Sequence, residues 1–253
     1  MKNQIYLQAR LGSTRLPNKV LLKICNKSII EFMVERLRIV PNIEKIVLVT
    51  GPKNINESLI DEAKKIGIDF FCGSQENILD RFYNASLIFK PDRIIRVTGD
   101  CPLIDPKVIE KGIQIFNSNN FDILSNVKKR TYPDGLDFEI MTCDILEKTW
   151  YNKMNEFINK QAFYEASLPP TKFILQNNNI RQYDLLNNED LSNIRLTLDY
   201  PEDYSLLLLI AENLYPYDKL FGLEDIMKFI RTNASILDIN KQFVKTDYGL
   251  QVK

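Results

Sequence analysis

The chain has 253 residues, with 33 lysines and arginines against 33 aspartates and glutamates, so its formal net charge is zero. This balance and the 45% hydrophobic content are typical of a globular protein and lack the basic footprint of a dedicated nucleic-acid binder. Histidine is absent, which excludes Ser-His-Asp and Cys-His nucleophilic sites, HExxH zinc sites and histidine proton shuttles. Any chemistry must therefore use carboxylates, lysine, arginine, cysteine, backbone amides or a bound metal.

The spacing of glycine and cysteine excludes further classes of site. No two of the nine glycines are two or five positions apart, so neither a GxGxxG loop nor a Walker A loop is present. The four cysteines, Cys25, Cys72, Cys101 and Cys143, form no CxxC pair. Without histidine, a tetrahedral zinc site would need all four thiolates, and isolated reduced thiols are the better interpretation.

Long apolar segments are also missing. The N-terminus reaches Arg10 after only about five largely apolar residues, which is too short for the hydrophobic region of a signal peptide. The longest later apolar run, Leu206 to Ala211, is far below the ~20 residues that a membrane span needs. We therefore expect a cytoplasmic protein without a membrane partner.

Short apolar runs alternate with helical periodicity through the first half of the chain. The runs predict strands at Gln4–Gln8, Glu44–Thr50, Ile68–Phe71 and Arg93–Thr98. The periodic segments predict helices at Ser28–Val40, Asn56–Ile66, Asn77–Phe89 and from Asp105-Pro106 onward. This β-α alternation predicts an α/β protein with a doubly wound, mostly parallel sheet.

The pattern changes after about residue 121. Strands are expected at Phe121–Ser125 and Leu136–Thr142, followed by an amphipathic helix at Cys143–Phe163. Lys172–Leu175 and Ile180–Leu185 are expected to pair as antiparallel strands around a turn at Asn177–Asn179. Helices are predicted at Pro201–Leu214 and after Gly222. No linker or internal repeat interrupts the chain, so residues 1–253 are interpreted as one domain with an elaborated second half.

The loop after the first strand carries a group of side chains suited to phosphate. It offers a glycine for close backbone approach, hydroxyl groups and three cations, and it leaves the carboxyl end of a strand, where open α/β sheets bind ligands. Its residues are Gln8, Ala9, Arg10, Leu11, Gly12, Ser13, Thr14, Arg15, Leu16, Pro17, Asn18 and Lys19. A solvated basic loop is the alternative interpretation.

Two aspartates follow strand-like runs and are candidates for binding a hard cation. Asp100 comes directly after Thr98-Gly99 at the end of a buried strand, and Asp199 stands just before the helix that opens at Pro201. Asp105 is a better helix cap than Asp100 for the helix that follows. An aspartate near a first-turn proline is also an ordinary cap, so the residues alone leave Asp199 open between the two roles.

Four segments together resemble one enzyme family. They read QARLGSTRLPNKVL, RVTGDCPLIDP, TYPDGLDFEI and RLTLDYPEDY, in the family's order and over residues 4 to about 214. They are similar to the cytidylyltransferases, which include CMP-Kdo and CMP-acylneuraminate synthetases, and most of all to the SpsF-like branch of spore coat polysaccharide biosynthesis. The resemblance implies a three-layer α/β/α nucleotide-diphospho-sugar transferase fold and a homodimer, in which residues 121–190 supply acceptor-side and dimer elements.

The resemblance also implies roles for individual residues. Arg15, Lys19, Asp100 and Asp199 are the expected catalytic residues, with Mg²⁺ bound by the two aspartates. Contacts to the nucleotide are expected from Gln8, Ala9, Arg10, Gly12, Ser13, Thr14, Asn77, Arg81, Thr98 and Gly99. Contacts to the acceptor are expected from Asp134, Asp137 and Glu139.

The implied reaction takes CTP and an acidic acceptor and yields a cytidylyl-linked product and pyrophosphate. The segment Asn159–Tyr164 lacks the histidine that is usual in this branch, so the acceptor stays open between a nonulosonic acid, another keto-sugar acid and a phosphorylated small molecule. A nucleotide-sugar glycosyltransferase is the alternative function, although no D-x-D metal motif occurs in the chain. A non-catalytic binding protein would have no chemical need for Arg15, Lys19, Asp100 and Asp199 together.

Overall fold

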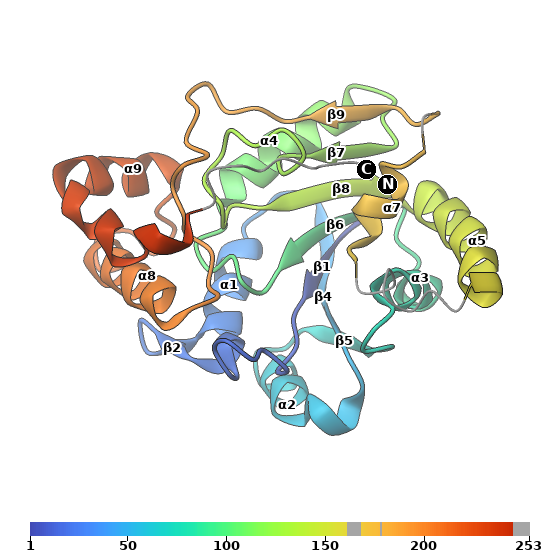
Figure 1. Ribbon diagram of the computed structural model, residues 1–253, viewed down its shortest axis with the longest axis horizontal. Coiled ribbons are helices and arrows are strands. Elements are labelled where there is room, and N and C mark those ends of the chain that lie inside the picture. The colour runs from blue at the N-terminus through green and yellow to red at the C-terminus, as the bar shows by residue number, and fades with distance from the viewer. Residues whose placement is uncertain (161–167, 178, 245–253) are drawn as a thin grey trace.

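Seven strands form one mixed, mostly parallel sheet with helices on both faces (Figure 1). The structure is a computed structural model that describes residues 1–160, 168–177 and 179–244. The strands, in spatial order, are β5 (Asp69–Cys72), β4 (Ile43–Thr50), β1 (Asn3–Gln8), β6 (Arg93–Thr98), β8 (Phe138–Thr142), β7 (Ile123–Ser125) and β9 (Gln182–Asp184).

The direction of pairing separates the two halves of the sheet. The four strands β5, β4, β1 and β6 pair in parallel, with β1 between β4 and β6. β8 runs antiparallel to both β6 and β7, and β9 is parallel to β7. The predicted α/β fold with a mostly parallel sheet is therefore confirmed.

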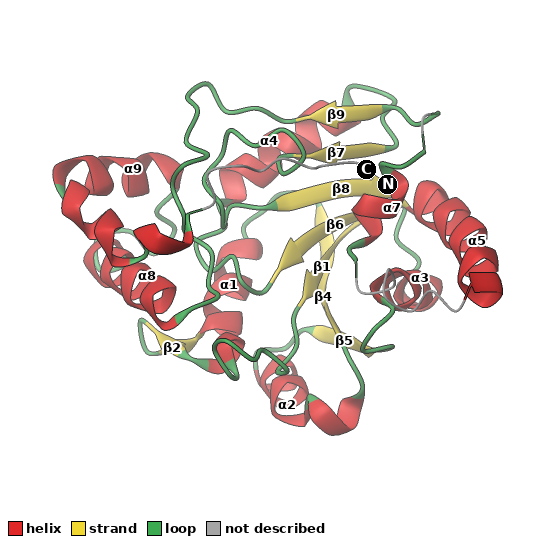
Figure 2. Ribbon diagram, in the orientation of Figure 1, coloured by secondary structure: helices red, strands yellow, loops and turns green. Residues whose placement is uncertain are grey.

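The helices of the described residues divide between the two faces (Figure 2). They are α1 (Ile29–Leu37), α2 (Glu57–Lys65), α3 (Ile78–Phe89), α4 (Pro106–Asn117), α5 (Cys143–Lys160), α7 (Pro170–Ile174), α8 (Pro201–Leu214) and α9 (Leu223–Thr232). A small hairpin, β2 (Lys23–Ile24) with β3 (Lys27–Ser28), and the 3-10 turns η1 (Lys19–Leu21), η2 (Lys53–Ile55), η3 (Ala234–Ile239) and η4 (Lys241–Phe243) complete the elements.

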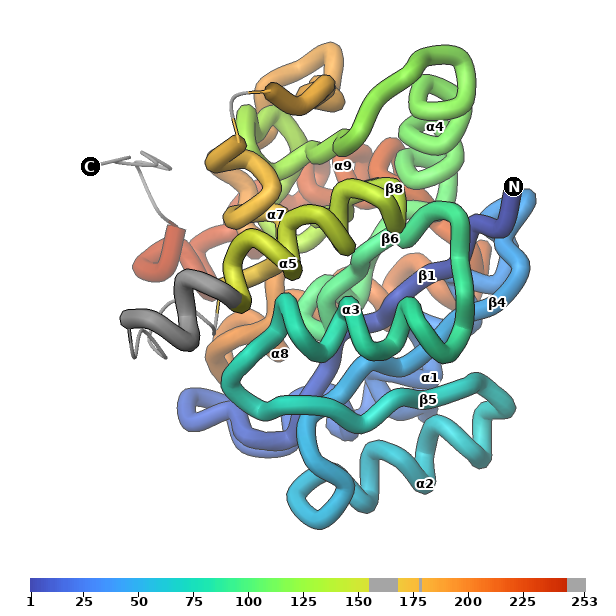
Figure 3. Tube along the Cα trace, turned by 90° about the vertical axis from the view of Figure 1, so that its right-hand side faces the viewer, coloured from blue at the N-terminus to red at the C-terminus, as the bar shows by residue number. Residues whose placement is uncertain are grey.

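Side chains of the central strands point alternately to the two faces of the sheet, and each face has its own hydrophobic core. Ile5 and Leu7 of β1 pack with α1, α4, α8 and α9 on one face. Tyr6, between them in sequence, packs on the other face with α3, α5 and α7. Figure 3 shows α3 and α5 lying against each other on that second face. Successive strand side chains point to opposite faces, so continuous apolar strands need both layers of helices.

Most of the predicted elements are present close to their expected ends. Ser28 caps α1 by accepting a hydrogen bond from the amide of Glu31, and Asp105 caps α4 ahead of Pro106. The cysteines are free thiols, as expected. In the described ranges, no helix combines the length and the apolar character required to cross a membrane.

The expected hairpin at Lys172–Leu175 and Ile180–Leu185 is wrong. Pro170–Ile174 forms the helix α7, and β9 pairs in parallel with β7 instead of with a neighbour in sequence. Pro170 occupies the first turn, where its fixed φ favours a helix, and a short apolar run has no periodicity that separates strand from helix. Residues 161–163 of the predicted helix and residue 178 of the predicted turn lie outside the described residues.

Candidate active site

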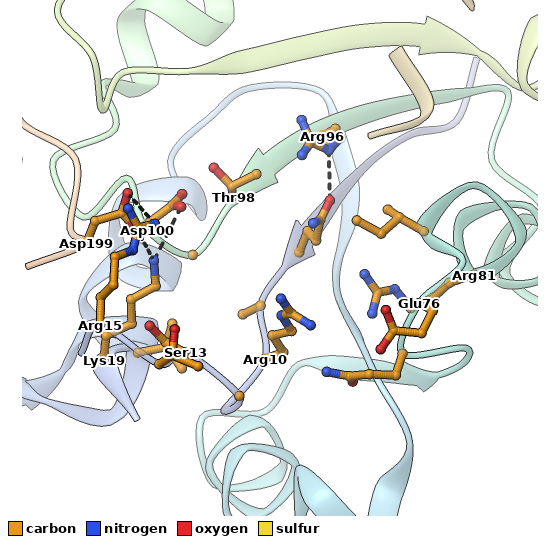
Figure 4. A pocket seen from close by; sticks show the side chains of 18 residues that line it. Arg10, Ser13, Arg15, Lys19, Glu76, Arg81, Arg96, Thr98, Asp100 and Asp199 are labelled. Carbon is orange, nitrogen blue, oxygen red and sulfur yellow. Dashed lines mark hydrogen bonds and ion pairs between the residues drawn. The ribbon is translucent and has the colours of Figure 1, made fainter. Parts of the chain in front are cut away.

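A cleft of about 420 Å³ opens at the carboxyl ends of β1 and β6 (Figure 4). It is lined by the predicted residues Gln8, Ala9, Arg10, Gly12, Ser13, Thr14, Arg15, Lys19, Arg81, Thr98, Gly99, Asp100 and Asp199. Ile78 also lines the cleft, as do four residues that were not predicted to bind substrate: Val20, Gln75, Glu76 and Arg96. Its size lies within the range of about 300–1,000 Å³ usual for small-molecule sites.

The backbone at the mouth of the cleft is held by short-range contacts. The amide of Gly99 donates to the carbonyl of Gln8 over 2.8 Å, which joins the ends of β6 and β1. A Cβ at Gly99 would lie 2.9 Å from the Cβ of Ala9, so this close approach requires glycine. The side chain of Asn56, at the start of α2, accepts from the amide of Leu11 over 3.0 Å and anchors the loop that follows β1.

Lys19 joins the two candidate metal ligands. Its Nζ lies 2.9 Å from Oδ1 of Asp199, 3.4 Å from Oδ2 of Asp100 and 2.8 Å from the carbonyl oxygen of Leu198. The Lys19 side chain is only 13% exposed, so the ammonium group is largely withdrawn from water where it meets the carboxylates. Asp100 and Asp199 follow Lys19 by 81 and 180 positions in the sequence, and both contact its ammonium group.

The charged groups in this contact shift each other's pKa. Burial by itself would lower the pKa of Lys19, but the carboxylates of Asp100 and Asp199 raise it above its ordinary value. Burial would raise the pKa of Asp100, but Lys19 and a hydrogen bond from Thr98 lower it below its ordinary value. The Lys19–Asp100 contact is therefore an ion pair at neutral pH.

Asp199 reaches the cleft because its segment lies beside the end of β6. The amide of Leu198 donates to the carbonyl of Asp100 over 2.8 Å, and the hydroxyl of Thr197 donates to the same oxygen over 3.1 Å. These bonds place the two aspartates at the same edge of the sheet.

The cap of α8 is supplied by Asp203 instead of Asp199. Oδ2 of Asp203 accepts from the amides of Asp199 and Tyr200 over 2.9 and 3.0 Å, and Tyr200 occupies the N-cap position. Asp203 is fully buried and paired with Arg195 at 2.8 Å. The alternative interpretation of Asp199 as a simple helix cap is therefore wrong, and its carboxylate faces the cleft.

Arg15 adds a second cation at the same place. Its Nη2 lies 3.0 Å from Oδ2 of Asp199, and its Nη1 donates to the hydroxyl of Tyr200 over 3.2 Å. The Arg15 side chain is 51% exposed. We call Arg15, Lys19, Asp100 and Asp199 the carboxylate end of the cleft.

Three arginines, Arg10, Arg81 and Arg96, give the rest of the cleft a different character, and we call them the arginine end. Arg81 is 2% exposed, and within the described ranges its side chain donates only to the carbonyl of Ser74, over 3.3 Å. Its Nε has no hydrogen-bond partner among the described residues. Burial, followed by the charges of Arg10 and Arg96, lowers the pKa of Arg81 to about 10. This end therefore has unused hydrogen-bond donors and a surplus of positive charge.

Gln75 reaches the same part of the cleft over a glycine. A Cβ on Gly51 would lie 1.9 Å from Oε1 of Gln75, so the Gln75 amide occupies space that a side chain at position 51 would take. That oxygen is buried and has no partner among the described residues. A buried amide without a partner is costly, and a polar ligand in the cleft would relieve the cost.

The predicted residue Asn77 is not among the lining residues. Its side-chain oxygen accepts from the amide of Asp80 over 2.9 Å and caps α3, the helix that carries Arg81. Its expected contact with the nucleotide stays a prediction.

The three predicted acceptor residues are not among the residues that line the cleft, and each pairs with an arginine. Asp137 receives two hydrogen bonds from Arg130, of 2.6 and 2.7 Å, and Asp134 lies 3.4 Å from Arg195. Burial raises the pKa of Asp137 despite the nearby guanidinium. Their contact with an acceptor stays a prediction.

Glu139, the third of these residues, acts on the cleft through Arg96. Its Oε2 lies 2.6 Å from Nη1 of Arg96, and its Oε1 accepts from Thr171 of α7 over 3.1 Å. Arg96 also donates from Nε to Gln8 over 2.9 Å, which ties β6 to β1 (Figure 4). Arg96 alternates with Thr98 along β6, and this period of two is the signal that could have placed it in the cleft.

Comparison with known proteins gives a consistent family. A sequence model of the cytidylyltransferases matches residues 5–238. An uncharacterised protein of Methanocaldococcus jannaschii is 32% identical over 246 residues, which cover 96% of each chain. The spore coat polysaccharide biosynthesis protein SpsF of Bacillus subtilis is 38% identical over 112 residues, which cover 43% of this chain and 47% of SpsF.

A solved structure matches at nearly full length. A cytidylyltransferase from Leptospira borgpetersenii superposes with a TM-score of 0.85 and 33% sequence identity, over 94% of this chain and 97% of that one. The match of the sequence model covers the loop after β1, the two aspartates and the cleft between them. This chain therefore belongs to the cytidylyltransferase family of nucleotidyltransferase enzymes.

Proposed function

We propose that this enzyme transfers the cytidylyl group of CTP to an oxygen of an acidic acceptor, a sugar acid or a related acidic or phosphorylated small molecule, in surface polysaccharide or glycan biosynthesis. The observation that carries the proposal is the contact of Lys19 with both Asp100 and Asp199. It brings cations from the loop after β1 and two carboxylates from distant segments to one point of a cleft large enough for a nucleotide.

In this reaction a lone pair of the acceptor oxygen forms a bond to the α-phosphorus of CTP. The bond between that phosphorus and the oxygen bridging to the β-phosphate breaks, and pyrophosphate leaves with the electron pair. A hydroxyl acceptor gives up its proton to solvent, whereas an ionised phosphate has none to lose. Such a transfer depends mainly on positioning and charge, so the absence of histidine is no obstacle.

The chain's cations suit the leaving group. Arg15 and Lys19 lie next to each other around Asp199 and would neutralise the charge that grows on pyrophosphate. Without substrate, Arg15 and Lys19 each pair with a carboxylate. When the nucleotide binds, its phosphate oxygens would replace the carboxylate oxygens as partners of the two cations. Ser13 and Gly12, on the same loop, also line the cleft.

The carboxylate end also fits Mg²⁺. In the described part of the chain, no cluster of three or more Cys, Asp or Glu side chains could enclose a metal by protein ligands alone. Magnesium is usually held by one or two carboxylates together with substrate phosphates and water, and Asp100 and Asp199 are such a pair. When bound there, magnesium would polarise the phosphate and lower the pKa of an attacking hydroxyl.

The arginine end fits the remaining parts of the substrates. Arg81 and Gln75 have unpartnered polar atoms, which suits the base and ribose of the nucleotide. Arg96 would present a guanidinium group to an acidic acceptor, and Glu139 would orient it from β8. Selectivity for an acidic acceptor would then come from Arg96 on β6 and from Glu139 of the second half of the chain, together with the homodimer that the resemblance implies.

A matrix of nucleotides and acceptors, with pyrophosphate release as the measurement, tests this function. CTP, UTP, ATP and GTP would each be combined with a 2-keto-3-deoxy sugar acid, a nonulosonic acid and a sugar phosphate. We expect release with CTP and at least one acidic acceptor, and release slowed by about 10²-fold or more in the Asp100→Asn variant. Release of a nucleoside diphosphate from a nucleotide sugar, in the absence of pyrophosphate, would favour the glycosyltransferase instead.

Heating the protein with each nucleotide tests the binding site separately from turnover. A ligand present at about 100 times its Kd stabilises the folded state by about 2.7 kcal/mol. We expect CTP with Mg²⁺ to raise the melting temperature more than the other three nucleotides do. Equal shifts with all four would contradict the preference for cytosine, and no shift with any would contradict the site.

A further inference from the structure

We propose that the segment Asn240–Phe243, which we call the C-terminal clamp, positions Arg15 and Asp199 for the reaction. The clamp lies just beyond residues 5–238, which the family's sequence model matches. It contains η4 and two inward-facing side chains, Asn240 and Phe243. The inference rests on the proposed function, because it assigns these residues a role in orienting the groups that would bind the nucleotide phosphates.

Phe243 acts on Arg15 through Tyr200. The rings of Phe243 and Tyr200 are stacked, with centroids 3.8 Å apart and planes within 3° of parallel. The guanidinium carbon of Arg15 lies 4.8 Å from the Tyr200 ring centroid, and Arg15 also donates to the Tyr200 hydroxyl. Since Arg15 is half-exposed, this ring and Asp199 supply the contacts that hold it toward the cleft. Stacking by Phe243 restrains the ring and thereby the guanidinium group.

Asn240 acts on Asp199 through Asp203. The Asn240 side chain is 1% exposed and donates from Nδ2 to Oδ1 of Asp203 over 2.9 Å and to the carbonyl of Arg195 over 3.1 Å. Asp203 in turn accepts from the backbone amide of Asp199. The clamp therefore contacts both the side chain that binds Arg15 and the carboxylate that fixes the backbone of Asp199.

The residues between these two face solvent and supply matched controls. Among the described residues, Lys241 pairs only with Asp238, at 3.5 Å, and its side chain is 78% exposed. Gln242 donates to Glu202 over 3.3 Å at the surface. Within the clamp, the first and last side chains face inward and the two between them face solvent. Variants of the outward pair therefore show whether an effect comes from the inward contacts or from any change in this segment.

The test compares pyrophosphate release by Phe243→Ala, Phe243→Tyr and Gln242→Ala at a temperature where all three are folded by circular dichroism. An aromatic pair is worth about 0.5–1.5 kcal/mol, so we expect Phe243→Ala to lower kcat/KM for CTP by about 2- to 10-fold. Phe243→Tyr keeps the stacked ring and should restore most of the loss. Gln242→Ala should match the unchanged protein.

A double-mutant cycle with Arg15→Ala shows whether the effect passes through Arg15. If it does, Phe243→Ala lowers kcat/KM in the unchanged protein and has little further effect when Arg15 is already alanine. Equal fold-losses in both backgrounds, or no loss in either, would overturn the proposal. A purely structural role would give equal losses, since it does not depend on Arg15.

Hydrogen exchange separates failure of the clamp from failure of the proposed function. If the unchanged protein releases no pyrophosphate with any acceptor, the proposed function is wrong and the clamp can still be measured in the ligand-free chain. We then expect Phe243→Ala to speed amide exchange at residues 12–16, 18–19 and 199–200, and to leave α2 unchanged. Unchanged exchange at these residues would overturn the clamp by itself.

Discussion

The two ends of the cleft differ in how their charges are balanced. At the carboxylate end, Arg15 and Lys19 are matched by Asp100 and Asp199, with nitrogen-to-oxygen distances of 2.9 to 3.4 Å. At the arginine end, burial and the positive charges of Arg10 and Arg96 lower the pKa of Arg81 to about 10. Figure 4 shows Glu76 beside Arg81, and Arg10 between Arg81 and Ser13.

The difference indicates what each end does when substrate binds. Matched charges can exchange partners at small cost, because a phosphate oxygen replaces a carboxylate oxygen and a metal ion replaces an ammonium group. Unmatched, buried donors gain hydrogen bonds that the free protein does not make. The carboxylate end is therefore suited to chemistry and the arginine end to recognition, and the following variants test this division.

The largest loss is expected from removing one carboxylate. Asp100→Asn and Asp199→Asn should each slow pyrophosphate release by about 10²-fold or more, the usual scale for a preorganised charge at a reacting centre. Stability should change little, since Asp203 and not Asp199 caps α8. Added Mg²⁺ should partly rescue either variant, and the double variant should lose far less than the product of the two single losses.

The matched contrast is Asp203→Asn, which removes the buried partner of Arg195. It should cost about 3 kcal/mol in the free energy of unfolding, because it leaves a buried charge poorly compensated. Urea denaturation of the three single variants separates the two outcomes. A fully active Asp199→Asn enzyme at limiting Mg²⁺ would remove Asp199 from the site.

Loss of one loop cation should have the next largest effect. Lys19→Ala and Arg15→Ala should each slow turnover by about 10²-fold at saturating CTP, while the fold survives. We expect the greater loss for Lys19, since its ammonium group contacts both carboxylates and Arg15 contacts only one. Lys23→Ala, an exposed change a few residues further along, is the control. Near-normal turnover of both site variants would show that the loop is only a solvated surface.

For a variant at the arginine end, we expect weaker binding of CTP together with an unchanged or higher free energy of unfolding. Arg81→Met removes a buried guanidinium group that has no carboxylate in hydrogen-bond contact among the described residues. The variant should keep its unfolding free energy or gain up to about 1 kcal/mol, because a buried charge is costly to desolvate. KM for CTP should rise about tenfold, by analogy with one lost charge-assisted hydrogen bond. A destabilised variant with unchanged KM would make Arg81 a structural residue.

The smallest expected effect is on the pH dependence of stability. The folded pKa of Lys19 lies above its ordinary 10.5, so its stabilising contribution is complete below pH 10.5 and is lost as the pH rises through the folded value. Lys19→Met should therefore flatten this alkaline loss, whereas Lys23→Met should leave it unchanged. Denaturant unfolding at pH 7, 9 and 11 measures the difference. Parallel curves for the unchanged protein and Lys19→Met would contradict the ion pair.

Asp100 contributes to the pH dependence of stability on the acidic side. Its folded pKa is below its ordinary 3.8, so its contribution is present above pH 3.8 and is lost as the pH falls through the folded value. Asp100→Asn should remove this part of the acid loss, which unfolding at pH 5, 4 and 3 would measure. An acid limb identical to that of the unchanged protein would show that Asp100 and Lys19 are not coupled.

Local patterns in the sequence determined most of the elements and the parts of the site that lie along one segment. β-branched runs and capping residues predict β1, β4, β6, α1 and α4 because periodicity and caps act within a few residues. The loop after β1 is readable for the same reason, since its glycine, hydroxyl groups and cations are contiguous. The same reasoning fails at Pro170–Ile174, where a four- or five-residue run is too short to carry a period.

Only the tertiary structure decided how distant segments meet. Hydrogen bonds from Thr197 and Leu198 to the carbonyl of Asp100 bring Asp199 to Lys19 across 180 positions of sequence. Asp203 takes over the capping that Asp199 was equally able to provide by residue type. Gln75 enters the cleft because Gly51 leaves space, and Phe243 reaches Tyr200 from beyond the family's matched residues. Such contacts depend on side-chain direction and on how closely packed segments approach each other, which residue types and local spacing do not specify.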